Sequence, residues 1–349
     1  MVLYWALLLL PLWGIFSPRR LRSEQAWIPW AGIGMLLATV IGLREQVGGD
    51  WGSYQTHFRN VAEMSLRGAL TETKDPGYYL LNWLASRAGA TVHAANLACA
   101  AIMMAGVIRF CREQPFPWLA LFVAVPYLLI VVGMGYTRQS AAIGLVMLGL
   151  AALGNGHTRT FVVWTLIAAS FHKSAVLLLP VAALAATERR LWNLVWIAVI
   201  AALGAWLFVL DSSEQLWSSY VRSDYAHAAE GGAIRVAMNA APAVLLIVWN
   251  QRLLRAGQER KLWLWLAVAS LVCVPLLSIS ATAVDRIALY LIPLQLLTFA
   301  RLPTLARSRE VRTAMVLAVV VYYATVQYVW LNFASHAGAW IPYRFVFMP

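Results

Sequence analysis

Charged residues interrupt or flank several long apolar segments of this chain, and their types suit the binding of a phosphate-rich anion. Arg138 opens one such segment, His172-Lys173 interrupts a second, and Asp285-Arg286 lies between two more. Charged side chains at membrane depth are costly and are functional candidates by default. Guanidinium groups bind phosphate oxygens bidentately and stay charged at any working pH. We therefore expect a pocket that attracts a doubly charged anion such as a pyrophosphate.

A polar segment near residue 50 carries side chains that suit proton transfer and sugar contacts. Gly48-Gly49 predicts a tight turn, and a helix that starts at Asp50 would hold this carboxylate in its first turn, where an anion is favoured. Tyr54 and His57 then follow on the same helix face. The alternative interpretation is a helix cap followed by an aromatic stripe.

Two further places have the same two interpretations, as binding residues or as structural residues. Gly231-Gly232 followed by Arg235 opens another apolar segment, and the tail contains Trp340-Ile341-Pro342-Tyr343-Arg344. A single arginine at such a place can be a snorkelling anchor, a lone histidine can be a packing residue, and a tryptophan can belong to an interfacial belt. The number of separate placements favours a binding site.

The composition indicates that membrane-spanning helices position these residues. The 349 residues are 61% hydrophobic and 12% charged, with 17 Trp. Soluble domains have about 25% charged residues, so an ordinary soluble domain and a disordered chain are both excluded. We expect spans near 2–17, 26–43, 91–108, 116–135, 139–154, 191–210, 234–250, 262–284, 287–300 and 313–333.

Two segments differ from simple spans. Residues 76–89 predict an amphipathic helix that lies in the membrane interface. Residues 160–186 form an apolar run that His172-Lys173 breaks, which favours a broken or re-entrant pair of short helices. The predicted fold is an all-α polytopic integral membrane protein with about 10–12 transmembrane segments, as one membrane domain over 1–349.

The net charge of +12 tests the orientation of these spans. With the N-terminus outside, the inside loops carry 16 Lys and Arg residues against five Asp and Glu residues, which accounts for +11 of that charge. The positive-inside rule therefore explains the positive net charge, and nucleic-acid binding is not needed to account for it. The outside then holds two long loops, at about 44–75 and 211–233, and the tail 334–349.

Several short motifs follow one another along the chain: Arg44…Val47-Gly48-Gly49-Asp50…Tyr54, Asp75-Pro76-Gly77-Tyr78…Leu81, Arg138-Gln139, Phe171-His172-Lys173-Ser174-Ala175, Gly231-Gly232…Arg235, Asp285-Arg286…Tyr290 and Trp340-Ile341-Pro342-Tyr343. In this order they resemble the EpsG-like family of Wzy-type polysaccharide polymerases. The departures are small: Gly49 and Trp51 stand where many relatives have Thr and Tyr.

The resemblance implies an inner-membrane glycosyltransferase that joins undecaprenyl-pyrophosphate-linked oligosaccharide repeat units on the periplasmic side. We assign stabilisation of the leaving pyrophosphate to Arg138 and Arg286. The base that deprotonates the acceptor hydroxyl is His172 or Asp50, with Glu45 or no single base as the remaining options. Cys99, Cys111 and Cys273 show no metal-like spacing, and we expect neither a metal nor a cofactor. The expected substrate-binding residues are Arg44, Tyr54, Tyr78, Gln139, Lys173, Arg235, Asp285 and Tyr343.

Other functions stay open at this point. An O-antigen ligase would use the same donor, and a flippase or transporter of lipid-linked oligosaccharides would also need a cationic cavity. The absence of an obvious internal repeat disfavours the transporter. A membrane acyltransferase and a structural assembly subunit are further alternatives. Expected partners are membrane lipid, the lipid-linked substrates, and the chain-length regulator and export proteins of the pathway, with no nucleic acid.

Overall fold

The structure, a computed structural model, describes residues 1–17, 27–71, 75–186, 190–208 and 232–348. The described residues form helices and contain no β-strand beyond isolated bridges, which confirms the all-α prediction. Their contacts divide the chain into two compact units. The first unit comprises 1–145, 170–172 and 317–349, and the second comprises 146–169 and 173–316.

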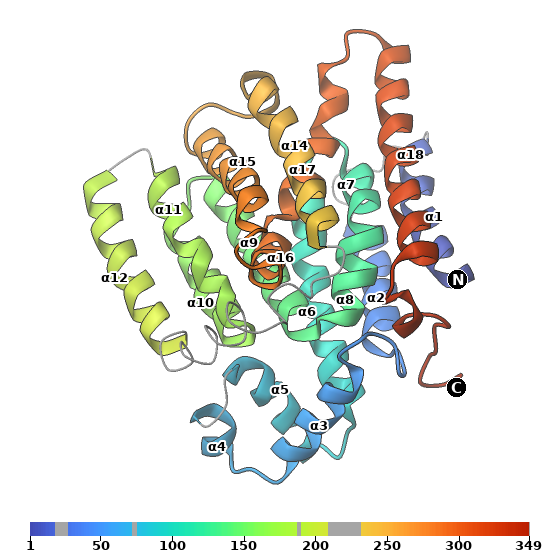
Figure 1. The fold of residues 1–349 in the computed structure, drawn as a ribbon, viewed down its shortest axis with the longest axis vertical. Helices are drawn as coiled ribbons and strands as arrows, with labels where there is room; N and C mark the ends of the chain where they lie inside the picture. The colour runs from blue at the N-terminus through green and yellow to red at the C-terminus, as the bar shows by residue number, and fades with distance from the viewer. Residues whose placement is uncertain (18–26, 72–74, 187–189, 209–231, 349) are drawn as a thin grey trace. The chain divides into compact units, whose positions relative to one another are not determined.

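The first unit holds the amino-terminal helices and the tail (Figure 1). Its short helices α3, α4 and α5 pack together, and α5 also packs on α6. The elements are α1 (Val2–Phe16), α2 (Trp27–Gly42), α3 (Trp51–Ala62), α4 (Leu66–Thr71), α5 (Pro76–Arg87), α6 (Val92–Arg112), α7 (Pro117–Ala124), the π-helix η1 (Val125–Val132), α8 (Gly133–Gly135), the start of α9 (Thr137–Gly154), most of α18 (Arg309–Phe333) and η8 (Ala337–Ala339).

The second unit holds the middle of the chain. In it α14 packs against α15, α16 and α17, and α11 packs against α12 and α15. The elements are most of α10 (Thr158–Phe171), η2 (Lys173–Leu178), α11 (Leu179–Ala185), α12 (Arg190–Phe208), α14 (Gly232–Leu253), α15 (Gln258–Leu276), α16 (Ala281–Ala288), η6 (Leu289–Leu291), α17 (Pro293–Arg301) and η7 (Leu302–Leu305).

Helix length and hydropathy make the chain a multi-pass membrane protein. Five helices among the described residues are long and apolar enough to cross a bilayer: 92–112, 117–135, 137–154, 232–253 and 309–333. A sixth candidate is the bent pair 281–291 and 293–305, with an angle of 46°. Shorter apolar helices lie at 2–16, 27–42, 158–171, 173–185 and 194–203.

The predicted break in 160–186 is confirmed: α10 ends at Phe171, and a separate 3₁₀ turn begins at Lys173. The expected helix at 76–89 is present as α5. The segment 44–75, expected as a loop with a helix start at Asp50, contains α3, whose N-cap is Asp50, and α4. The predicted loop 211–233 lies almost wholly outside the described residues.

The expected spans 262–284 and 287–300 are divided at the wrong place. Asp285 and Arg286 were placed between two spans, but both lie inside α16. The helix starts earlier because the Ser280 side chain accepts a hydrogen bond from the Ala283 N–H, at 3.2 Å. A hydroxyl cap satisfies one of the unpaired donors of a helix start. The break therefore falls at 277–280.

The span 117–135 is the central helix of the first unit. In this span 94% of the most apolar stretch is buried inside the protein, whereas in span 309–333 only 28% of the most apolar stretch is buried. Apolar side chains that are not covered by protein in a membrane protein face lipid. Span 117–135 is therefore covered by protein, whereas most of span 309–333 is left for lipid to cover.

Two glycines allow α6 and α9 to cross closely within the first unit. A Cβ atom on Gly106 would overlap the carbonyl oxygen of Gly144, and a Cβ on Gly144 would overlap the backbone of Met103. Small residues at helix crossings let membrane helices gain contact between their backbones. This crossing matters for function because α9 begins with the residues described below.

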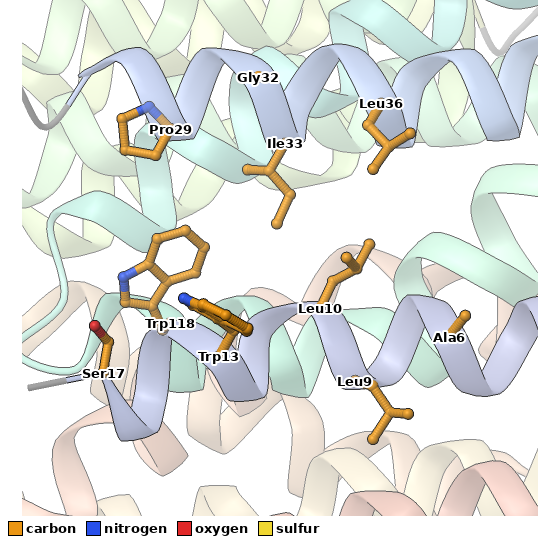
Figure 2. A pocket seen from close by; sticks show the side chains of 11 residues that line it. Ala6, Leu9, Leu10, Trp13, Ser17, Pro29, Gly32, Ile33, Leu36 and Trp118 are labelled. Carbon is orange, nitrogen blue, oxygen red and sulfur yellow. The ribbon is translucent and has the colours of Figure 1, made fainter.

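An apolar groove of about 700 Å³ lies between α1 and α2 (Figure 2). In Figure 2 Trp13 and Trp118 lie close to each other at one end, and Ile33 and Leu10 face the space between the helices. The lining contains no charged side chain, and Ser17 supplies its only hydroxyl. The groove therefore suits hydrocarbon and offers nothing to bind an anion.

We predict that Gly106→Ala destabilises the protein by about 1–3 kcal/mol, the usual cost of overpacking, because the new methyl group forces α6 and α9 apart. Thermal unfolding in detergent measures this loss. The control is Gly32→Ala on α2, where a Cβ meets no atom within 4 Å. Equal melting temperatures for the two variants would contradict the close crossing.

Candidate functional site

The first feature of the site is an ion pair at the start of α9. Arg138 is the second residue of this span, and its Nη1 atom donates to Oδ2 of Asp75 at 2.6 Å. Asp75 precedes Pro76, the first residue of α5, so its carboxylate lies at a helix N-terminus, where an anion is favoured. The Asp75 side chain is 6% exposed and that of Arg138 is 28% exposed. The Arg138 side chain thus stays partly accessible.

Aromatic rings surround this pair. The guanidinium carbon of Arg138 lies 5.9 Å from the ring centroid of Tyr78, a cation–π distance. The Tyr78 ring meets that of Tyr54 edge to face, with centroids 5.9 Å apart. Burial first, and then the charge of Asp50, raise the pKa of Tyr54 to about 12. Tyr54 is therefore a neutral phenol at working pH, with Asp50 close enough to act on it.

Arg44 has a different environment from Arg138. Its side chain is completely buried, and it donates to Ile41 O at 2.6 Å, Val47 O at 3.0 Å and Thr137 Oγ1 at 2.7 Å. Burial lowers the pKa of this guanidinium. Three of its five N–H groups are thus used inside the protein. Arg44 connects the end of α2 to the first residue of α9.

Residues of the C-terminal tail form hydrogen bonds with the segment around Arg44 and with neighbouring helices. The Gly48 N–H donates to Ala339 O at 2.8 Å, and the Glu45 N–H donates to Arg344 O at 3.0 Å. The Tyr343 hydroxyl donates to Val40 O at 2.8 Å, and the Trp340 indole N–H donates to Ile130 O at 3.1 Å. Tyr343 and Trp340 therefore each donate to a backbone carbonyl, and substrate binding by Tyr343 stays a prediction.

Within the first unit, the last residues of α10, just before His172, lie close to α5. A Cβ atom on Gly77 would overlap the Ser170 hydroxyl and lie 3.1 Å from the Phe171 ring. Gly77 follows Asp75 by two residues, so the end of α10 and the acidic partner of Arg138 are near neighbours. His172 itself is partly buried at this junction.

Two histidines have side-chain partners here: His57, which the sequence placed on the same helix face as Tyr54 without a catalytic role, and His93. His57 on α3 hydrogen-bonds through Nδ1 to the Tyr79 hydroxyl at 2.9 Å. His93 on α6 hydrogen-bonds through Nε2 to Oε2 of Glu45 at 2.7 Å and through Nδ1 to Thr91 Oγ1 at 3.0 Å.

The second unit contains another arginine–aspartate pair. Arg235 on α14 donates through Nε to Oδ1 of Asp285 on α16, with side chains 16% and 10% exposed. One turn further along α14, Asn239 accepts from Gln295 Nε2 at 2.6 Å and donates to the Ala288 carbonyl at 2.8 Å. These bonds stabilise polar groups inside apolar helices.

The remaining predicted residues have these places. Gln139 is buried in α9, one residue after Arg138. Lys173 begins η2 and Arg286 follows Asp285 in α16, and both are partly buried. The structure thus brings Arg138, Asp50, Tyr54 and Tyr78 together in the first unit, while Lys173, Arg235, Asp285 and Arg286 belong to the second.

Metal ligands do not cluster in the described part of the chain. Within it, no three His, Cys, Asp or Glu side chains are close enough together to share a metal ion. Cys99, Cys111 and Cys273 are buried free thiols. The chemistry available from these residues is anion binding by guanidinium groups and proton transfer by imidazole or carboxylate.

We predict that Arg138 and Asp75 stabilise the fold as a coupled pair. A double-mutant cycle with Arg138→Gln and Asp75→Asn should give a coupling free energy of about 1–3 kcal/mol, because Asp75 is nearly inaccessible to water. The measurement is the free energy of unfolding in detergent.

The control cycle uses Arg109 in α6 and Glu113, the residue that caps this helix, with side chains 61% and 25% exposed. Their coupling should stay below about 0.5 kcal/mol. Coupling of the same small size for both pairs would contradict the buried contact.

Comparison with known proteins supports the resemblance seen in the motifs. The model of the EpsG family matches residues 27–345, nearly the whole chain. No curated protein and no solved structure matches. EpsG-like proteins are Wzy-type polymerases, so the match supports a polysaccharide polymerase-type function.

Proposed function

We propose that this chain, which belongs to the EpsG family, joins undecaprenyl-pyrophosphate-linked oligosaccharide repeat units at the periplasmic face of the bacterial inner membrane. The observation that carries the proposal is the Arg138–Asp75 pair at the start of a membrane span. A cation placed there costs free energy, and a carboxylate on a neighbouring helix offsets that cost. In this proposal a phosphate binds to the partly exposed Arg138 side chain.

The reaction transfers a growing glycan to a hydroxyl of the incoming unit. The hydroxyl oxygen bonds to the anomeric carbon, and the bond from that carbon to the pyrophosphate oxygen breaks. Arg138 stabilises the charge that develops on the departing pyrophosphate. Arg286, Lys173 and Arg235 belong to the second unit, and their roles toward phosphate stay predictions from the sequence. Asp285 orients Arg235 through its ion pair.

Arg44 takes a positioning role in this proposal. Its N–H groups already bind Ile41, Val47 and Thr137. Because Thr137 directly precedes Arg138, Arg44 fixes the start of α9 without touching substrate. Tyr78 and Tyr54 are buried beside the guanidinium, and Gln139 is buried one residue after it in α9, so these residues help to hold Arg138 in position. Asp50 and His172 are the bases that the sequence suggests for the acceptor hydroxyl.

The direct test is incubation of the purified protein in liposomes with lipid-linked repeat units. A polymerase yields a ladder of products that differ by one repeat, whereas a flippase moves unaltered lipid and a ligase needs a lipid A core acceptor. Arg138→Lys and Arg286→Lys should each lower the rate about 10²–10³-fold, because lysine keeps the charge but loses the fork geometry.

The control in this assay is Arg109→Lys, at an exposed site outside the proposed pocket. Normal ladders from both test variants would refute the arginine assignment. The proposal requires no metal, so an excess of chelator should leave the rate unchanged, and chelator sensitivity would argue against this part of it.

Cysteine labelling tests the proposed periplasmic face. The three native thiols are buried, which keeps the background low. In intact cells with a permeabilised outer membrane, a membrane-impermeant maleimide should label Ser53→Cys on α3 and leave Ser308→Cys unlabelled. Both serines are exposed. The reverse pattern would invert the orientation and place Arg138 in the cytoplasm.

A further inference from the structure

His57 and Tyr79 form a pair beside the Arg138 cluster that no role in the proposed reaction has used. His57 lies on α3 and Tyr79 on α5, and His57 Nδ1 is 2.9 Å from the Tyr79 hydroxyl oxygen. Their rings meet edge to face, with centroids 5.5 Å apart. The imidazole is half-buried, so a substrate can reach it while its orientation is fixed.

The pair adjoins the proposed pyrophosphate site. Tyr79 follows Tyr78, whose ring lies at cation–π distance from Arg138. The charged and titratable groups that face His57 are Tyr79 on α5 and Arg138 on α9, and Arg138 is paired with Asp75. Burial first, and then Arg138, lower the pKa of His57 below its usual 6.5. The imidazole is therefore neutral at pH 7.

The hydrogen bond to Tyr79 engages Nδ1 of His57 and leaves Nε2 as the nitrogen that faces a substrate in the proposal. When Nδ1–H donates to the phenol oxygen, Nε2 holds the free lone pair of the neutral imidazole. Nε2 makes no hydrogen bond within the described residues. A neutral, oriented imidazole with one accessible nitrogen is what general-base catalysis requires.

His93 provides a contrast on the same side of the first unit. Both of its ring nitrogens are engaged, with Glu45 and with Thr91. Its Nε2 is therefore occupied by a carboxylate and cannot accept a proton from a substrate. His93 is a matched control: a histidine in a similar region whose contacts are structural.

The geometry points to His57 as the general base that deprotonates the acceptor sugar hydroxyl, an inference that rests on the proposed polymerase function. The hydroxyl proton passes to His57 Nε2 as the oxygen bonds to the anomeric carbon. The electron pair of the broken carbon–oxygen bond leaves with the lipid pyrophosphate, which Arg138 stabilises. The imidazolium, whose Nδ1–H bonds Tyr79, then releases its proton to water.

This assignment gives Asp50 a different role. Its charge acts on the buried Tyr54 hydroxyl, and it lies at the start of α3, the helix that carries His57. Asp50 is thus a positioning residue for α3. His172 lies at the end of α10, and the two residues before it pack on Gly77.

The experiment is the pH profile of ladder formation in liposomes for wild type, His57→Gln and His93→Gln. A base acts in its deprotonated form, so the wild-type rate should fall as the pH drops through the lowered pKa of His57. His57→Gln should lose about 10²–10⁴-fold in kcat and lose this acidic limb, with KM changed only a few-fold. His93→Gln should keep the limb.

A second variant covers the case in which His57→Gln does not fold. Tyr79→Phe leaves His57 in place but removes the acceptor that stabilises the imidazolium, so the acidic limb should move to lower pH and kcat should fall. An unchanged profile in Tyr79→Phe, or full turnover in His57→Gln, would overturn the assignment.

Two further variants separate the competing bases. If the acidic limb persists in His57→Gln and disappears in His172→Gln or Asp50→Asn, that residue is the base and the inference is wrong. If the wild type makes no ladder with any repeat unit tested, the proposed polymerase function is wrong. That outcome is distinct from a wrong His57 assignment, in which the wild type does make a ladder.

Discussion

A guanidinium that is removed from both water and lipid headgroups must find its hydrogen-bond partners within the protein. Arg44 is the clearest instance in this chain, because it is completely buried and donates to Ile41, Val47 and Thr137. These bonds fix the turn after α2 and the first residue of α9 relative to each other. The tail bonds to the same turn through Ala339 and Arg344. The placement of Arg138 depends on this arrangement.

Arg44 and Arg138 show how burial separates two residues of one type. The neutral acceptors around Arg44 use its donors, and the residue acts as scaffold. Arg138 has one carboxylate partner, one aromatic face and an accessible side. A ligand with several phosphate oxygens can compete for the donors of the second arginine and not for those of the first. The proposed chemistry follows from this difference in free donors.

The two histidine pairs divide in the same way. His93 is held at both nitrogens, by Glu45 and Thr91, whereas His57 is held at one by Tyr79. The first arrangement fixes a ring and the second also leaves a nitrogen for substrate. Tyr79 adjoins Tyr78, so α5 carries the partner of the imidazole next to the ring that contacts Arg138. One short helix thus links the proposed anion site with the proposed base.

The sequence by itself determined the membrane fold, the position of Arg138 at the start of a span, and the break at His172, because hydropathy and charge along the chain decide where helices cross a bilayer. It misplaced the break near Asp285, since a serine cap is a weak local signal. Only the tertiary structure decided the partners: Asp75 lies 63 residues from Arg138, and Tyr79 lies 22 from His57. Such pairs form across packed helices, and their distances depend on packing that no local pattern encodes.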